Sequence, residues 1–111
     1  MGKVKLFVKY CLINEEVEYN INGILIDNQL KFLAKESKML LNLKSNVLKR
    51  ITESLEIIFD FNEKICFIID KSNNTNFSLD INLEILENEN GYFYVKYKIE
   101  EDKFEIRIQI V

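Results

Sequence analysis

The chain has 111 residues, of which 48% are apolar and 30% are charged, and it carries a formal net charge of −3 with no His, Trp or Pro. These values predict one soluble globular domain, residues 1–111, and they argue against a nucleic-acid binder, which would present a basic face. Because His is the usual general base and the commonest metal ligand, we expect no enzyme, no metal site and no cofactor.

The N-terminal stretch is apolar but lacks the pattern of a leader peptide, because Lys5 and Lys9 interrupt it and no small-residue cleavage site follows. No apolar run approaches the ~20 residues that span a bilayer. We therefore expect a cytoplasmic protein without a membrane partner. In that compartment Cys11 and Cys66 are free thiols, whereas a disulfide between them would require an oxidising compartment.

Apolar and polar residues alternate along the first part of the chain, which indicates β-strands with one buried face. The alternation runs through residues 3–12 and resumes at residues 17–26, where Gly23 interrupts it. Since Gly adopts unusual dihedral angles at little cost, Gly23 predicts a bulge or a sharp bend in the strand.

Residues 29–58 allow two interpretations. At a period of 3.6 their apolar residues form a helical stripe, and at a period of 2 they form short strands separated by polar breaks. The breaks are residues 36–38, 45–46 and 53–54. We favour strands, because the neighbouring segments are strands and the breaks recur at hairpin intervals. Strands are also expected over residues 55–61 and 65–69.

The C-terminal part of the chain alternates most strictly, in three blocks at residues 77–85, 93–99 and 104–110. The connectors at residues 87–91 and 101–102 are short and polar, which predicts antiparallel hairpins between the blocks. Acidic clusters such as Glu100-Glu101-Asp102 lie at such turns, so we expect them to be solvated rather than to bind a cation.

The register of these hairpins follows from placing the inward faces opposite each other. The expected pairs are Ile99 with Phe104, Tyr97 with Ile106, Val95 with Ile108, Ile85 with Phe93, Leu83 with Val95 and Ile81 with Tyr97. On the outer face, this register aligns Asp80, Lys98 and Glu105 in a ladder.

The whole pattern predicts an all-β fold, an antiparallel meander of about eight to ten strands that closes into a barrel, because closure removes exposed edges. Several segments also carry a resemblance to a known family. They are Asn22-Gly23 followed by LKFLAKES (30–37), VLKRITESLEIIF (47–59), TNFSLDINLEI (75–85), GYFYVKYKI (91–99) and FEIRIQI (104–110). Over most of its length the chain resembles the YwiB-like family of bacterial proteins of unknown function, whose fold is a calycin (lipocalin-like) β-barrel.

The resemblance implies a calycin-like barrel and no particular activity. Calycin barrels often hold small apolar ligands, but a fold does not define a function. Two positions depart from the family pattern. Ile51 stands where the family has a small residue after its Arg, and Ser78 stands where it has Gly after the Thr-x-Phe entry.

Arg50 and Tyr97 are the candidate ligand-binding residues. Tyr97 belongs to the inward face of its strand. If Leu48, Arg50 and Thr52 also face inward, the Arg50 guanidinium requires a carboxylate or a ligand; otherwise it is an ordinary solvated Arg. The leading hypothesis is a non-enzymatic binding module whose barrel interior or mouth takes a small, partly apolar ligand.

Tyr92 and Tyr94 lie on the expected outer face and support an alternative hypothesis. Outward Tyr residues mark some partner surfaces, so the protein could bind a partner or form a homodimer there, although Tyr is also common in any sheet. Arg107 is expected to pair with an acid on the same face. Six Phe residues are expected in the core: Phe59, Phe61, Phe67, Phe77, Phe93 and Phe104.

Overall fold

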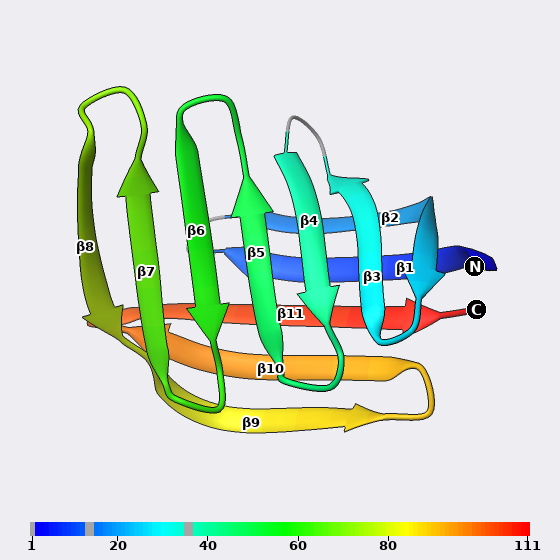
Figure 1. Cartoon of the computed structure of the whole chain (residues 1–111). Coiled ribbons are helices and arrows are strands. Elements are labelled where there is room, and N and C mark those ends of the chain that lie inside the picture. The colour runs from blue at the N-terminus through cyan, green and yellow to red at the C-terminus, as the bar shows by residue number, and fades with distance from the viewer. Residues whose placement is uncertain (1, 13–14, 35–36) are drawn as a thin grey trace.

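The structure is a computed structural model that describes residues 2–12, 15–34 and 37–111, and these residues form eleven strands of a single antiparallel sheet (Figure 1). The strands are β1 (Gly2–Leu12), β2 (Glu15–Ile26), β3 (Gln29–Ala34), β4 (Ser37–Asn42), β5 (Val47–Ile51), β6 (Leu55–Asp60), β7 (Ile65–Asp70), β8 (Thr75–Asp80), β9 (Asn82–Glu89), β10 (Tyr92–Ile99) and β11 (Asp102–Ile110). The described part of the chain contains no helix that could cross a membrane.

The predicted all-β antiparallel meander is confirmed, with more strands than the expected eight to ten. The described parts of residues 29–58 form strands β3 to β6, so the helical interpretation of that stretch is wrong. The strand order is β8-β7-β6-β5-β4-β3-β2-β1-β11-β10-β9, in which β1 pairs with β11 and the two edges are β8 and β9.

The sheet folds into two crossed layers and forms a nearly closed barrel. In Figure 1, β3 to β8 form the front layer, and β1, β9, β10 and β11 form the back layer. Strand β2 joins the layers on one side, because it pairs with β1 along most of its length and with β3 over Ile24–Ile26. On the other side the chain passes from β8 to β9 through the buried residue Ile81, whose N–H donates to the carbonyl of Lys64 (2.9 Å).

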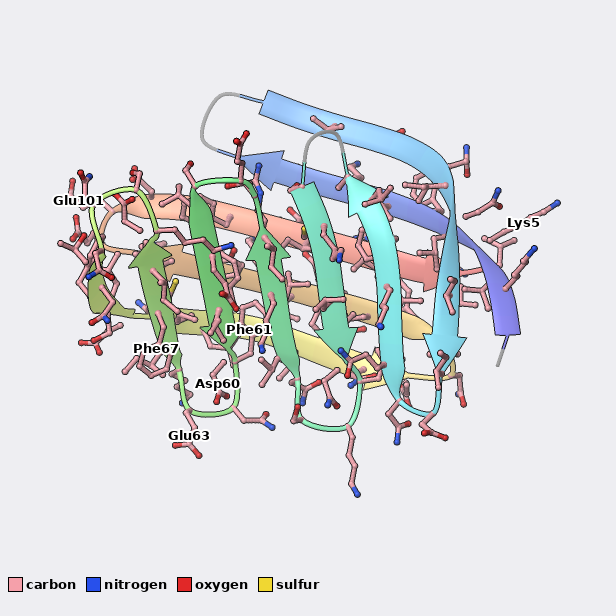
Figure 2. All side chains as sticks on the ribbon, turned by 45° about the horizontal axis from the view of Figure 1, so that its top comes forward. Lys5, Asp60, Phe61, Glu63, Phe67 and Glu101 are labelled. Atoms are coloured by element: carbon pink, nitrogen blue, oxygen red, sulfur yellow. The ribbon has the colours of Figure 1, made fainter. Side chains whose placement is uncertain are left out.

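Strand β2 curves from the back layer into the front layer (Figure 2), and Gly23 immediately precedes the residues of β2 that pair with β3. A Cβ atom at this position would lie 2.8 Å from Cδ1 of Leu6 and 3.0 Å from the carbonyl oxygen of Lys31. The pairing of β2 with β1 continues without interruption through Gly23, which stands opposite Val4. The predicted bend is therefore present, and the predicted bulge is not.

The β10–β11 register differs from the expected one by two residues. Tyr97 pairs with Phe104, and Ile99 pairs with Asp102, because the hairpin turn consists of Glu100 and Glu101 alone. Glu100 has a φ of 57°, the left-handed conformation that such a tight turn requires. A slip of two residues preserves the face of every side chain, so the inward set is as predicted while its partners are not.

The block at residues 77–85 is not one strand. It divides at Ile81 into β8 and β9, which lie in different layers, and Asp80 pairs with Ile65 rather than lying beside Lys98. A bulge in β9 places Ile85 opposite Lys96 and Leu83 opposite Tyr97. The expected Ile85–Phe93 pair is therefore wrong, and Ile85 is 38% exposed.

The core lies between the two layers, and four of the six expected Phe residues face it. Phe67 and Phe77 do not belong to the core, because they are 42% and 53% exposed. Phe67, labelled in Figure 2, lies on the outer face opposite Ile58, while its neighbours Cys66 and Ile68 point inward. Phe77 is on the edge strand β8.

Asn88 is a polar contact between the layers that the sequence does not predict. Its side-chain Nδ2 donates from β9 to the carbonyl of Leu43 (2.5 Å) and to Oδ1 of Asn46 (2.6 Å), both in the turn between β4 and β5. These bonds hold the back layer against one end of the front layer.

Candidate ligand-binding cavity

A cavity of about 710 Å³ lies between the two layers of the barrel. Its wall consists mainly of apolar side chains from β4 to β8 on one side and from β10 and β11 on the other, with Val8 of β1 and Phe32 of β3. A volume of this size is within the range of small-molecule sites, roughly 300–1,000 Å³.

A cluster of aromatic rings packs beside the cavity. The Tyr97 ring centroid lies 5.2 Å from that of Phe61, 5.8 Å from Phe59 and 5.3 Å from Phe104. Phe61 and Phe93 are fully buried and do not line the cavity, whereas the other three rings do. The barrel interior is therefore filled on one side of this cluster and hollow on the other.

Arg50 lines the cavity from β5, so the structure places it on the inward face. Its cross-strand partners are Met39 on β4 and Ile57 on β6, and both line the cavity as well. Leu48, two residues earlier on the same face, is fully buried. Arg50 itself is half-buried, and no carboxylate of the described residues lies within ion-pair distance of it.

Tyr97 lines the same cavity from β10 and is 2% exposed. Burial raises the pKa of its hydroxyl above the ordinary range, and the charge of Arg50 acts in the opposite direction. Tyr97 is therefore neutral at every physiological pH and is able to donate a hydrogen bond.

Cys66 contributes a thiol to the cavity wall from β7. Burial raises the pKa of this thiol to about 11, which makes it a poor nucleophile at neutral pH. Cys11 is also free. Its cross-strand neighbours are Glu16 on β2 and Glu105 on β11, on the outer face of the back layer. Because the two thiols lie on opposite faces, they do not form a disulfide.

The other polar groups among the described lining residues lie at the start of β4 and at the β10–β11 turn. Ser37 begins β4 and is buried, and its hydroxyl donates to the carbonyl of Ala34 (2.7 Å). Glu100 and Asp102 are exposed at the β10–β11 turn, next to Glu101 (labelled in Figure 2). Among the described residues, the cavity thus has one cation in its wall and two solvated carboxylates at its rim.

Tyr92 and Tyr94 lie on the outer face of β10, away from the cavity. Their ring centroids are 6.4 Å apart, and the Arg107 guanidinium carbon lies 4.7 Å from the Tyr94 ring centroid. Arg107 also pairs with Glu105 (Nη2–Oε1 3.9 Å), as expected. Both Tyr side chains are half-buried, so they pack within the sheet face rather than forming an exposed aromatic patch.

A second hollow, of about 840 Å³, lies on the outside where β2 and β3 separate. The described residues that line it include four exposed lysines: Lys3, Lys5, Lys31 and Lys38. Surface lysines are solvated in any case, so this groove lacks the enclosed polar groups that define a small-molecule site. We therefore place the candidate site in the interior cavity.

Within residues 2–12, 15–34 and 37–111, no group of three or more His, Cys, Asp or Glu side chains is arranged to hold a metal ion. Asp70, which begins a calcium-like D-x-S-x-N run, accepts hydrogen bonds from Ser72 and Asn73 and caps its own turn.

The structure brings Arg50 and Tyr97 to one cavity and places Tyr92 and Tyr94 together elsewhere. The sequence does not identify Ser37 or Cys66 as cavity residues, because both belong to segments whose apolar pattern permits either face. Glu100 and Asp102 are exposed as expected, and only the folded chain places them at a cavity rim.

Comparison with models of known protein families, with curated proteins and with solved structures gives no match to this chain. The resemblance to the YwiB-like family stays a prediction.

Proposed function

We propose that this chain is a non-enzymatic binding protein that holds a small, partly apolar ligand in its interior cavity. The single observation that carries the proposal is the cavity of about 710 Å³ whose apolar wall includes Arg50 and Tyr97. Small-molecule sites combine an apolar wall with a few convergent polar groups in this way. The proposal includes a calycin-like barrel and a cytoplasmic location, which the sequence predicts.

The alternative is a partner-binding or homodimer surface around Tyr92 and Tyr94. It has less support, because these rings pack against each other and under Arg107 instead of projecting into solvent. Interface anchors gain most of their binding energy from apolar area that is exposed in the free protein.

The test is native mass spectrometry of freshly purified protein, followed by titration with the uncharged fluorescent probe N-phenyl-1-naphthylamine. We expect either a mass excess that is lost on denaturation or saturable binding of the probe. The variant Ile57→Trp fills part of the cavity and should weaken probe binding at least several-fold. Its matched control is Ile58→Trp, which adds the same bulk on the outer face of β6.

A bare protein mass together with no saturable probe binding would contradict the proposal. Equal weakening by Ile57→Trp and Ile58→Trp would also contradict it, because the probe would then bind outside the cavity. A dimer mass that Tyr94→Ala converts to monomer would favour the alternative surface.

A further inference from the structure

We infer that the ligand of this cavity is an amphipathic acid, with an anionic head group bound by the Arg50 guanidinium and the Tyr97 hydroxyl and an apolar tail against the cavity wall. This inference rests on the proposed function, because it names the ligand class of the same cavity. Carboxylates and phosphate esters share the chemistry that these two groups recognise.

The expected negative charge of the head group follows from the positive charge in the cavity wall. Arg50 is the cation among the described residues that line the cavity, and its cross-strand neighbours Met39 and Ile57 are apolar. A half-buried guanidinium loses hydration, and an anion restores the lost hydrogen bonds. The planar guanidinium fork also matches the two oxygens of a carboxylate or phosphate better than an ammonium group does.

Tyr97 adds a directional donor from the opposite layer. The Tyr97 side chain is 2% exposed and lines the same cavity as Arg50, and burial raises the pKa of its hydroxyl, which therefore stays protonated. A neutral hydroxyl can donate to an anion that a guanidinium of the same cavity binds, so we assign both side chains to one head-group site. Hydrogen bonds to a charged group are stronger than those between neutral groups.

Glu100 and Asp102 are the only other charged side chains among the described residues of the cavity wall. Both are exposed, so water already stabilises them and they require no ligand. Their negative charge disfavours an anion at the β10–β11 turn. An anionic head group is therefore expected at Arg50, and the tail is expected along apolar side chains such as Leu48, Ile68 and Ile106.

The test compares three ten-carbon amphiphiles that differ in head-group charge: decanoate, decan-1-ol and decylammonium. Each is used to displace N-phenyl-1-naphthylamine from the full chain. We expect decanoate to bind roughly tenfold more tightly than decan-1-ol, the ratio that one charge-assisted hydrogen-bond pair supplies. Decylammonium should bind no better than decan-1-ol.

The variant Arg50→Met should reduce decanoate binding to the level of decan-1-ol while the uncharged probe still binds. Arg107→Met is the matched control, because it removes the same charge from the outer face, and it should retain the preference for decanoate. Tyr97→Phe removes only a hydroxyl and should weaken decanoate binding several-fold. It provides an independent readout if Arg50→Met fails to fold.

Equal affinity for decanoate and decan-1-ol, or a preference that survives both Arg50→Met and Tyr97→Phe, would overturn the inference. Tightest binding of decylammonium would overturn it as well and assign the head-group site to Glu100 and Asp102. In these cases probe binding still supports the proposed function. If the probe itself does not bind, the proposed function fails together with the inference.

Discussion

Arg50 on β5 and Tyr97 on β10 lie in opposite layers of the barrel and line the same cavity. They are 47 positions apart in the chain, and no hairpin connects them. Both reach this cavity because the sheet folds over itself at β2 and again at Ile81. Arg50 is the only charged residue on the inner face of β5, so the largely apolar wall of this cavity contains a guanidinium from one layer and a phenol from the other.

Arg50→Met should stabilise the ligand-free protein. The substitution replaces a half-buried guanidinium by an apolar side chain of similar length, which favours the folded state by about 1 kcal/mol. Arg107→Met should have the opposite sign and cost about 0.5–1 kcal/mol, because Arg107 pairs with Glu105 and lies over the Tyr94 ring. Urea unfolding of the two variants measures both changes. Destabilisation by Arg50→Met would show that the guanidinium already has a partner within the protein.

Tyr97→Phe should leave the free energy of unfolding within about 1 kcal/mol of the parent value, in either direction. The aromatic contacts with Phe59, Phe61 and Phe104 involve the ring and are retained. Thermal unfolding measures the effect, with Tyr97→Ala as the reference that removes the ring and should cost several kcal/mol. If Tyr97→Phe costs more than about 2 kcal/mol, the hydroxyl has an internal hydrogen-bond partner.

The fold class and the inward faces of the C-terminal strands could be predicted from the sequence, because strict alternation in β10 and β11 leaves one choice of buried face. Register could not be predicted to the same degree. It depends on turn length, and the turn at Glu100 and Glu101 is shorter than the polar segment around it suggests. The sequence does not show that the strand divides at Ile81. This residue stays buried while the chain changes layers, so the alternation of apolar and polar residues continues through it.

The faces of β7 show where the period-2 pattern is uninformative. Its sequence ICFIID places apolar residues at both parities, and the inward set proves to be Cys66 and Ile68 rather than Phe67. The cavity could not be predicted at all. Whether a barrel is hollow depends on how completely side chains from distant strands fill its interior. The local sequence pattern does not determine that unfilled volume.

Gly23→Ala should destabilise the protein by about 1–3 kcal/mol, the usual cost of inserting a methyl group into a packed site. The new Cβ would lie 2.8 Å from Leu6 and 3.0 Å from the Lys31 carbonyl oxygen, and the latter cannot move without disturbing the pairing of β2 with β3. Gly2→Ala is the control, because its Cβ would meet only the Leu25 carbonyl oxygen at 3.8 Å. Similar melting temperatures for the two variants would mean that the bend in β2 can open to accept a side chain.

The free energy of unfolding should decrease between pH 8 and pH 10, in part because of Cys66. Burial raises the pKa of this thiol from 9.0 to about 11, so its contribution is complete below pH 9 and is lost as the pH rises toward 11. At pH 10 the loss is about 1.4 kcal/mol, since the thiol is mostly ionised in the unfolded chain and mostly protonated in the folded one. Urea unfolding at several pH values measures the slope.

The matched variant for this slope is Cys66→Ala, which removes the titrating group and leaves Cys11 in place. It should lower the free energy of unfolding at pH 7 through the lost packing, yet show a shallower decrease from pH 8 to pH 10 than the parent. A thiol reagent gives a second readout. Cys66 should react far more slowly than Cys11, and an occupant of the cavity should slow it further, because Cys66 is 1% exposed and lines the cavity. Parallel pH slopes for parent and variant would show that the Cys66 thiol ionises as readily in the folded protein as in the unfolded chain.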